Sequence, residues 1–400
     1  MKIYQINSVC GFGSTGRIAL DLANALQANG DSCRIGYGRG TCDDPRAFRF
    51  ASDLDVKLHG VLSRVTDRHG FYSKAATMRL IADIEAYAPD VIHLHNLHGY
   101  YLNISTLFGF LKEYGRPVVW TLHDCWSFTG HCAHFDYIKC DKWLTGCKKC
   151  PQKRRYPASV IADNSRRNYT DKKRLFTSIP NLTLVTPSVW LSQLVKQSYL
   201  QNANIHCIPN GIDLSVFHPV ASDVKTRLGI ENRKIVLGVA SVWDDRKGLD
   251  DFVALSGILP EDYQIVLVGL TQQQKALLPE NILGILRTGS ARELAELYSA
   301  ADMFVNPTYE DTFPTTNLEA LACGTPVITY RSGGSPEAIA PDCGHVIDKQ
   351  ADLSQNVQQL KDAICNLSAA RHICAEQGAK YDKEQQFMQY ISLYSTLFQE

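Results

Sequence analysis

Short apolar runs alternate with helical periodicity along the chain. The β-rich runs of the first half lie at residues 2–7, 32–38, 90–95, 117–123 and 182–188, and a helical pattern fills 16–30. A second series has apolar runs at 234–241, 263–269, 303–308 and 325–330, with helical patterns at 250–259, 291–301 and 316–323. Strands alternating with helices are typical of parallel sheets that helices cover on both faces. The pattern predicts an α/β protein of two doubly wound, Rossmann-like domains.

The length and one irregular segment indicate where the domains meet. A chain of 400 residues exceeds what one hydrophobic core usually organises. Residues 207–220, CIPNGIDLSVFHPV, lack a helical period and contain a Pro-Asn-Gly turn, which is typical of a connector. We expect an N-terminal domain over 1–212, a C-terminal domain over 213–380, and a final helix with an apolar stripe over 381–400.

Composition and charge exclude several classes of protein. The formal net charge is zero, which gives no global reason to expect nucleic acid as a partner. The N-terminus lacks the features of a signal peptide, and no run approaches the ~18 apolar residues of a membrane-spanning helix. We therefore expect a cytoplasmic protein that contacts a membrane at most peripherally. Basic residues outnumber acidic ones over 139–174, as on a solvated surface or on one that meets an anionic membrane or a phosphate group.

Three glycines follow the first predicted strand. Gly11, Gly13 and Gly16 spell G-x-G-x-x-G where a helix begins, the spacing of a dinucleotide-binding turn. Such a turn also needs an acidic residue at the end of the second strand, and that strand ends in Tyr-Gly-Arg-Gly at 37–40. The loop is thus either a packing turn without a ligand or a helix N-terminus whose amides face an anion or sugar hydroxyls.

The segment NPTYEDTFPTTNLEALACGTPVITYRSGGSPE, residues 306–337, carries candidate donor chemistry. The acidic pair at 310–311 ends a strand, and a helix then begins near Thr315 and Thr316. Amides at this helix start could hold a diphosphate, Glu319 could bind ribose hydroxyls, and Asp311 could bind a sugar hydroxyl. Acids near a helix N-terminus can also simply cap it and favour its dipole.

The order of this segment resembles the donor-site signature of family-4 retaining glycosyltransferases, which have the two-domain GT-B fold with a cleft between the domains. In that signature an acid precedes a second acid, here Glu319, by eight positions, which falls on Asp311. IPNGID resembles the family's interdomain loop. VASVWDDRKGLDDFV resembles the loop whose basic pair, here Arg246 and Lys247, meets the donor diphosphate.

The resemblance extends to the first domain. TLHDCW places His123 and Asp124 after a strand, and His123 matches a family histidine near the donor sugar, although a lone histidine is more often a core residue. Asn96 and His98 end another strand and, with Asp124, are candidates for the acceptor side. Gly13 and Gly16 would approach the donor. The resemblance implies catalysis by His123, Asp311 and Lys247, retention at the anomeric carbon without a catalytic metal or cofactor, and a C-terminal helix that braces the first domain.

Four cysteines gather in an insertion over 131–151. Cys132, Cys140, Cys147 and Cys150 end in C-x-x-C, a ligand set typical of structural tetrahedral zinc, with free thiols or disulfides as alternatives. The surrounding pattern resembles bacterial exopolysaccharide glycosyltransferases of the colanic-acid type. That likeness implies a polyprenyl-diphosphate-linked acceptor, which the neighbouring basic stretch would suit at the inner face of the cytoplasmic membrane.

The resulting hypothesis is a retaining glycosyltransferase of surface polysaccharide assembly. Its partners would be a nucleotide-diphosphate sugar and a glycan or lipid-linked glycan acceptor. Two alternatives remain: a GT-B nucleotide-sugar epimerase, and a non-catalytic, zinc-stapled protein that binds glycan or nucleic acid.

Overall fold

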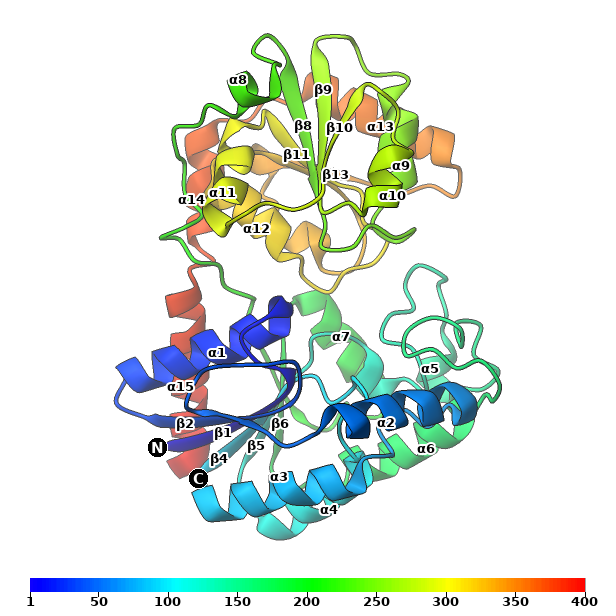
Figure 1. Ribbon diagram of the computed structural model, residues 1–400, viewed down its shortest axis with the longest axis vertical. Helices are drawn as coiled ribbons and strands as arrows, with labels where there is room; N and C mark the ends of the chain where they lie inside the picture. The colour runs from blue at the N-terminus through cyan, green and yellow to red at the C-terminus, as the bar shows by residue number, and fades with distance from the viewer. Residues whose placement is uncertain (400) are drawn as a thin grey trace. The chain divides into compact units, whose positions relative to one another are not determined.

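The computed structural model describes residues 1–399, and the chain forms two compact units. The first unit comprises Met1–Ile208 and the chain from Phe387 onward, and the second comprises Pro209–Gln386 (Figure 1). The chain therefore passes between the units twice, at residues 208–209 and at residues 386–387.

The first unit holds a parallel sheet of seven strands in the order β3-β2-β1-β4-β5-β6-β7. Its strands are β1 (Lys2–Val9), β2 (Ser32–Arg39), β3 (Ala47–Arg49), β4 (Val91–Leu94), β5 (Val118–Thr121), β6 (Leu182–Thr186) and β7 (Asn204–Cys207). Its helices are α1 (Gly13–Ala28), α2 (Asp53–Thr66), α3 (Lys74–Tyr87), α4 (Ile104–Tyr114), the 3-10 turn η1 (Trp126–Phe128), α5 (Lys142–Thr145), α6 (Ser165–Phe176) and α7 (Val189–Gln197).

The second unit holds a parallel sheet of six strands in the order β10-β9-β8-β11-β12-β13. Its strands are β8 (Lys234–Val239), β9 (Tyr263–Val268), β10 (Ile282–Ile285), β11 (Met303–Asn306), β12 (Val327–Tyr330) and β13 (Gly344–Ile347). Its helices are α8 (Val224–Leu228), α9 (Leu249–Ser256), α10 (Gln272–Ala276), α11 (Ala291–Ala300), α12 (Thr315–Ala322), α13 (Leu353–Asn366) and α14 (Arg371–Ala379), with 3-10 turns η2 (Ser335–Ala338) and η3 (Pro341–Cys343).

Alternation along the strands gives each unit two cores, one on each face of its sheet. Along β1, Ile3 packs with α1 side chains such as Leu22, whereas Tyr4 packs with α3 and α4 side chains on the opposite face. Along β8, Leu237 joins the core that includes α11 and α12, and Val236 joins the core that includes α9 and α13. Side chains at successive strand positions point to opposite faces, so strands covered on both sides are apolar throughout.

The strand order reverses once in each sheet, between β1 and β4 in the first unit and between β8 and β11 in the second. Open parallel sheets bind ligands outside the carboxyl ends of the strands at such switch points. The loops that follow these four strands are therefore the first places to look for function.

The last helix, α15 (Lys383–Gln399), belongs to the first unit from Phe387 onward. Phe387, Tyr390, Ile391 and Tyr394 are buried in the core that also contains α1. The Tyr394 hydroxyl lies 2.7 Å from His93 Nδ1 on β4. This apolar stripe and its hydrogen bonds fix the end of the chain to the first sheet.

Candidate active site

The loop after β8 presents two cations. Arg246 is held by Asp244 at 2.7 Å and by Glu310 at 3.4 Å, and Lys247 Nζ lies 2.5 Å from Asp311 Oδ2. Burial disfavours the charged guanidinium, but the two carboxylates outweigh this effect and raise the pKa of Arg246. Lys247 has three N–H donors and uses one on Asp311. The loop thus offers fixed positive charge to an anionic ligand.

Main-chain contacts set the shape of this loop. The Arg246 carbonyl accepts hydrogen bonds from Tyr309 N at 2.7 Å and from the Thr308 hydroxyl at 3.3 Å. Gly248 has φ +74°, and a Cβ at this position would stand 2.4 Å from the Pro307 carbonyl oxygen. Only glycine accommodates both the left-handed backbone and this close approach. The loops after β8 and β11 are therefore held together by backbone atoms.

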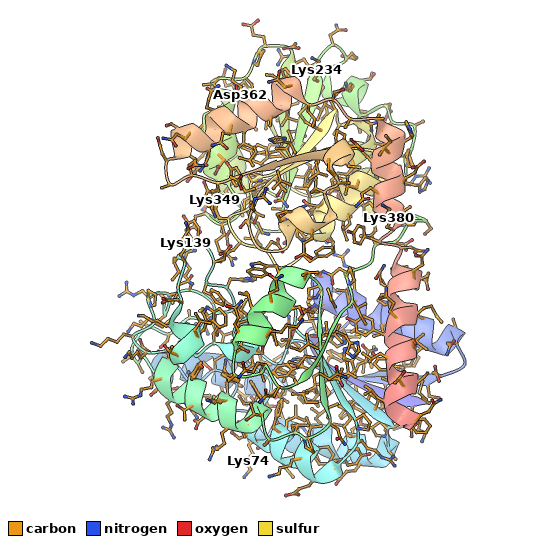
Figure 2. The ribbon with its side chains drawn as sticks, turned by 180° about the vertical axis from the view of Figure 1, so that it is seen from behind. Lys74, Lys139, Lys234, Lys349, Asp362 and Lys380 are labelled. Carbon is orange, nitrogen blue, oxygen red and sulfur yellow. The ribbon has the colours of Figure 1, made fainter. Side chains whose placement is uncertain are left out.

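The two acidic residues after β11, Glu310 and Asp311, each pair with a different cation. Glu310 is 4% exposed and contacts Arg246, whereas the partly exposed Asp311 contacts Lys247. Lys349, labelled in Figure 2, adds a third cation: its Nζ lies 3.3 Å from the Tyr309 carbonyl oxygen and 4.7 Å from the centre of that ring. Asp311 is thus the member of the pair that lies nearer the surface.

Helix α12 begins at Thr315, where the sequence predicted a helix start. Its N-cap, Pro314, makes no side-chain capping bond, and Thr315 and Thr316 are partly exposed. The first four N–H groups of a helix have no intrahelical acceptor, so the first turn presents N–H donors and the positive end of the helix dipole to an anion. One turn on, the Tyr298 hydroxyl donates to Glu319 Oε2 at 3.1 Å and orients this carboxylate.

The glycine loop of the first unit is a tight turn. Gly11 and Gly13 have φ values of +74° and +65°, and a Cβ on Gly16 would lie 3.0 Å from Val9 Cγ2. Nothing lies within 4 Å of the Cβ position at Gly13. Gly11 and Gly13 therefore meet a backbone requirement, Gly16 permits close helix–strand packing, and the space at Gly13 is open.

A chain of hydrogen bonds leads from β1 to His123. Gln5 Nε2 donates to the Ala19 carbonyl, so Gln5 Oε1 accepts from His95 Nε2 at 2.9 Å. His95, whose pKa burial lowers well below its usual range, is neutral and must accept at Nδ1, which lies 3.2 Å from His123 Nε2. Burial also lowers the pKa of His123 to about 4. Burial therefore keeps the His123 ring neutral, and Gln5, acting through His95, fixes its proton on Nε2.

A second histidine pairs with an aspartate at the same edge of this sheet. His98 Nε2 lies 2.6 Å from Asp124 Oδ2, and His98 Nδ1 lies 2.9 Å from the Tyr156 hydroxyl. Burial raises the pKa of Asp124, but His98 and other hydrogen bonds outweigh it and hold the value at about 2. Asn96 follows β4, and its backbone N–H donates to Asn7 Oδ1 at 3.3 Å. Asp124 is thus a charged carboxylate oriented by an imidazole.

The predicted site residues fall into two groups, one in each unit. Asn96, His98, His123 and Asp124 follow β4 and β5 in the first unit, where the glycine loop follows β1. Arg246, Lys247, Asp311 and the start of α12 gather in the second unit. Sequence reasoning missed Gln5, Asp244, Tyr156, Tyr298 and Lys349. Of these five residues, only Asp244 lies within a motif that the sequence singled out, the segment 239–253 that contains Arg246 and Lys247.

Comparisons with known proteins decide the family. Residues 15–216 match the family described as Glycosyltransferase Family 4, and residues 233–369 match the one described as Glycosyl transferases group 1. The chain belongs to glycosyltransferase family 4.

Several relatives of this glycosyltransferase are known. WcaC of Escherichia coli (strain K12), named as a colanic acid biosynthesis glycosyl transferase, is 26% identical, and the match covers 99% of this chain and 100% of the relative. An N-acetylgalactosaminyltransferase of Campylobacter jejuni, named for a diphospho-undecaprenol-linked substrate, is 29% identical over 46% of this chain and 52% of the relative.

Solved structures show the same fold. Sucrose-phosphate synthase of Thermosynechococcus elongatus superposes with a TM-score of 0.70 at 19% identity, covering 99% of both chains. Anabaena HepE, solved with UDP-glucose, has a TM-score of 0.66 at 16% identity, covering 99% of this chain and 100% of that one. The predicted architecture of two doubly wound units is confirmed as that of the GT-B glycosyltransferases.

The cysteine-rich insertion of the glycosyltransferase brings two of its four thiols into hydrogen-bond contact. The Cys132 and Cys150 thiols share a hydrogen bond, which lowers the pKa of Cys150 to about 7 against the opposing effect of burial. Across residues 1–399, no group of three or more His, Cys, Asp or Glu side chains is placed to hold a metal ion. The four-cysteine zinc site is thus not assembled in the structure, and zinc at Cys132, Cys140, Cys147 and Cys150 stays a prediction that metal analysis would test.

Proposed function

We propose that this chain is a retaining glycosyltransferase that moves a sugar from a nucleotide diphosphate to a glycan or lipid-linked glycan acceptor in surface polysaccharide assembly. The proposal of a nucleotide-diphosphate donor is carried by two neighbouring cations, Arg246 and Lys247, in the same unit as the start of α12, which has no side-chain cap. The names of WcaC and of the Campylobacter jejuni transferase support the acceptor half.

The second unit would hold the donor. Arg246, Lys247 and the first amides of α12 would neutralise the diphosphate, whose negative charge grows as the sugar leaves. Glu319, oriented by Tyr298, would accept hydrogen bonds from the ribose hydroxyls, and Asp311 from a sugar hydroxyl. Lys247 can keep its contact with Asp311 and still direct its other two N–H bonds at a phosphate oxygen.

The first unit would hold the acceptor. His123 is neutral and donates a hydrogen bond from its Nε2–H to His95, so its Nδ1 would accept a hydrogen bond from a hydroxyl of the donor sugar, and the ring would not act as a cation. Asn96, His98 and Asp124 would bind the acceptor hydroxyls. In a front-face displacement the departing phosphate oxygen takes the proton of the attacking hydroxyl, so the protein's contribution is positioning and charge stabilisation.

The test is nucleotide-sugar binding to the full chain followed by product analysis. UDP-, GDP- and ADP-sugars are screened for thermal stabilisation, and a true donor should raise the midpoint progressively with concentration. Lys247→Ala should weaken this thermal stabilisation and slow sugar transfer at least about 100-fold, because it removes a positive charge that stabilises the departing diphosphate in the transition state. Lys234→Ala is the matched control, since Lys234 is an exposed lysine at the start of β8.

The outcomes discriminate between the hypotheses. Retention requires a product whose anomeric configuration equals that of the donor, as measured by NMR. Conversion of the donor into its epimer without an acceptor would identify an epimerase. If no nucleotide sugar stabilises the protein and Lys247→Ala behaves like Lys234→Ala, the proposal fails.

A further inference from the structure

Helix α2 lies on the surface of the first unit (Figure 1), and its apolar side chains are exposed. Leu54, Leu58, Val61 and Val65 are each between 43% and 74% exposed. Their spacing of four, three and four residues confines them to an arc of about 60° on the helix. The buried residues of α2, His59, Gly60 and Ser63, lie on the opposite side. This arrangement is the reverse of an ordinary surface helix, whose apolar side faces the core.

Two more aliphatic side chains extend the stripe. Val160 and Ile161 are 63% and 68% exposed. Their segment is tied to the end of α2, because Val160 N donates to the Arg64 carbonyl at 2.7 Å and Ala162 N donates to the Val65 carbonyl at 3.1 Å. We call Leu54, Leu58, Val61, Val65, Val160 and Ile161 the α2 apolar face. Exposed apolar side chains that gather on one face mark an interaction site, unlike apolar side chains that are scattered singly over a surface.

The charges around the α2 apolar face are cationic. Lys57 and Arg64 are exposed on one flank of the stripe, and Lys153 Nζ lies 3.1 Å from the Ile161 carbonyl. The acids of α2 are already neutralised, since Asp53 pairs with Arg49 and Asp55 pairs with Arg79 at 2.7 Å. Long basic side chains beside an apolar stripe can reach lipid phosphates while the stripe enters the acyl region.

We propose that the α2 apolar face docks the enzyme on an anionic lipid bilayer, with α2 lying in the plane of the interface. The charge complementarity selects a bilayer over a second copy of the chain, whose matching face would carry the same cations. A helix of 14 residues is about 21 Å long, which suits an interfacial helix and falls short of a bilayer span. No helix within residues 1–399 is long and apolar enough to cross a membrane. The proposal rests on the proposed function, because a lipid-linked acceptor presents its reactive sugar at that interface.

The experiment measures sedimentation of the full-length protein with vesicles of phosphatidylglycerol and phosphatidylcholine, and with vesicles of phosphatidylcholine alone. The double variant Leu58→Gln/Val61→Gln should lower the partition coefficient on anionic vesicles by at least about tenfold, because two inserted aliphatic side chains are lost. Lys57→Gln/Arg64→Gln should lower it roughly tenfold or more on anionic vesicles and little on neutral ones. Leu277→Gln, at an 84% exposed leucine of the second unit, is the matched control and should change nothing.

Folding and donor binding are checked in the same samples. All four replaced side chains of the two double variants are exposed, so nucleotide-sugar stabilisation should equal that of the parent, and so should the thermal midpoint of Leu58→Gln/Val61→Gln. Lys57→Gln/Arg64→Gln also loses the cation–π contact of Arg64 with the Tyr100 ring at 5.4 Å, which costs about 1 kcal/mol at most. Unchanged vesicle binding by both double variants would overturn the docking proposal. So would a parent protein that self-associates in sedimentation velocity through a contact that Leu58→Gln/Val61→Gln abolishes, since a second copy would then cover the face. Absence of any nucleotide-sugar stabilisation in the parent would instead contradict the proposed function and leave vesicle binding as a separate result.

Discussion

At the scale of single residues, the candidate active site depends on side chains that orient other side chains. Gln5 contacts no substrate in the proposal, yet its amide decides which nitrogen of His95, and hence of His123, carries a proton. Tyr298 plays the same part for Glu319, and Asp311 for Lys247. Such partners set the geometry of a site as much as the groups that touch the ligand.

Replacement of Gly248 by alanine adds only one methyl group, yet it should lower both the stability and the activity of the protein. Gly248→Ala places a methyl group 2.4 Å from the Pro307 oxygen at a φ of +74°. We expect a loss of about 1–3 kcal/mol in the free energy of unfolding of the second unit, together with slower transfer because Lys247 moves. Chemical denaturation and a transfer assay measure the two effects.

Gly257→Ala provides the control at the other end of α9. Gly257 has φ −78°, and the nearest contact of an added Cβ is an ordinary 3.6 Å to the Ala254 oxygen. This variant should be neutral or stabilise the unit by up to about 1 kcal/mol. Equal behaviour of the two variants would contradict the argument from close approach.

At the scale of elements, the sequence predicted the strands that are buried on both faces and missed the strands at the edges of the sheets. The missed strands, β3, β7, β10 and β13, are partly exposed and lack a continuous buried run, whereas β4, β5, β11 and β12 are as short but fully buried. The same-side placement of His93 and His95 could be predicted from strand alternation, and their rings lie 4.0 Å apart. The Gln5–His95–His123 chain could not be predicted, because it joins three strands that are distant in sequence.

The apolar side of α2 shows a more general limit. Residues 54, 58, 61 and 65 have the spacing of a core-facing stripe. A periodic pattern says that a helix has an apolar side but not which way that side points. The direction is decided by the buried residues on the opposite side of the helix, His59 and Ser63, which a hydrophobic pattern does not reveal.

The contact between β4 and α15 makes the stability of the first unit depend on pH. Burial lowers the pKa of His93 to about 3, against about 6.5 in an unfolded chain. Below pH 6.5 the unfolded state binds a proton that folded His93 does not, so the stabilisation present above that pH is lost as the pH falls towards the folded pKa. The free energy of unfolding should decrease by about 1.4 kcal/mol per pH unit for this one group.

Denaturation of His93→Gln between pH 7 and pH 5 tests this dependence. The variant should be less stable than the parent at pH 7, because it loses contacts with Thr121 and Tyr394, and its stability should fall less steeply with acid. His345→Gln, at an exposed histidine of β13, should keep the parent slope. A His93→Gln slope equal to that of the parent would contradict the assignment.

At the scale of the whole molecule, each unit has its own sheet and its own pair of cores. We therefore expect calorimetry to resolve two unfolding transitions, one for each unit. A nucleotide sugar should raise the midpoint temperature of the transition of the second unit. The final helix belongs to the first unit from Phe387 onward, so substitutions in this helix should change the midpoint temperature of the transition of the first unit.

Tyr394→Ala is the corresponding prediction. This tyrosine is fully buried and bonded to His93, and its loss should cost the first unit about 3–5 kcal/mol. Met388→Ala, at a 51% exposed position of the same helix, should cost little. If Tyr394→Ala lowered both transitions equally, the two units would unfold as one.

The backbone bonds of the donor loop have a consequence for engineering. The Arg246 carbonyl, Tyr309 N and Gly248 hold the loops after β8 and β11 together through main-chain contacts, and the ion pair of Arg246 with Glu310 adds to them. Positions 241 and 242, whose side chains are exposed, can therefore be randomised while the two loops keep their path and Arg246 and Lys247 stay in place. A library at these two sites would keep the cations proposed to meet the diphosphate, whereas a library that included position 248 would consist mostly of destabilised protein.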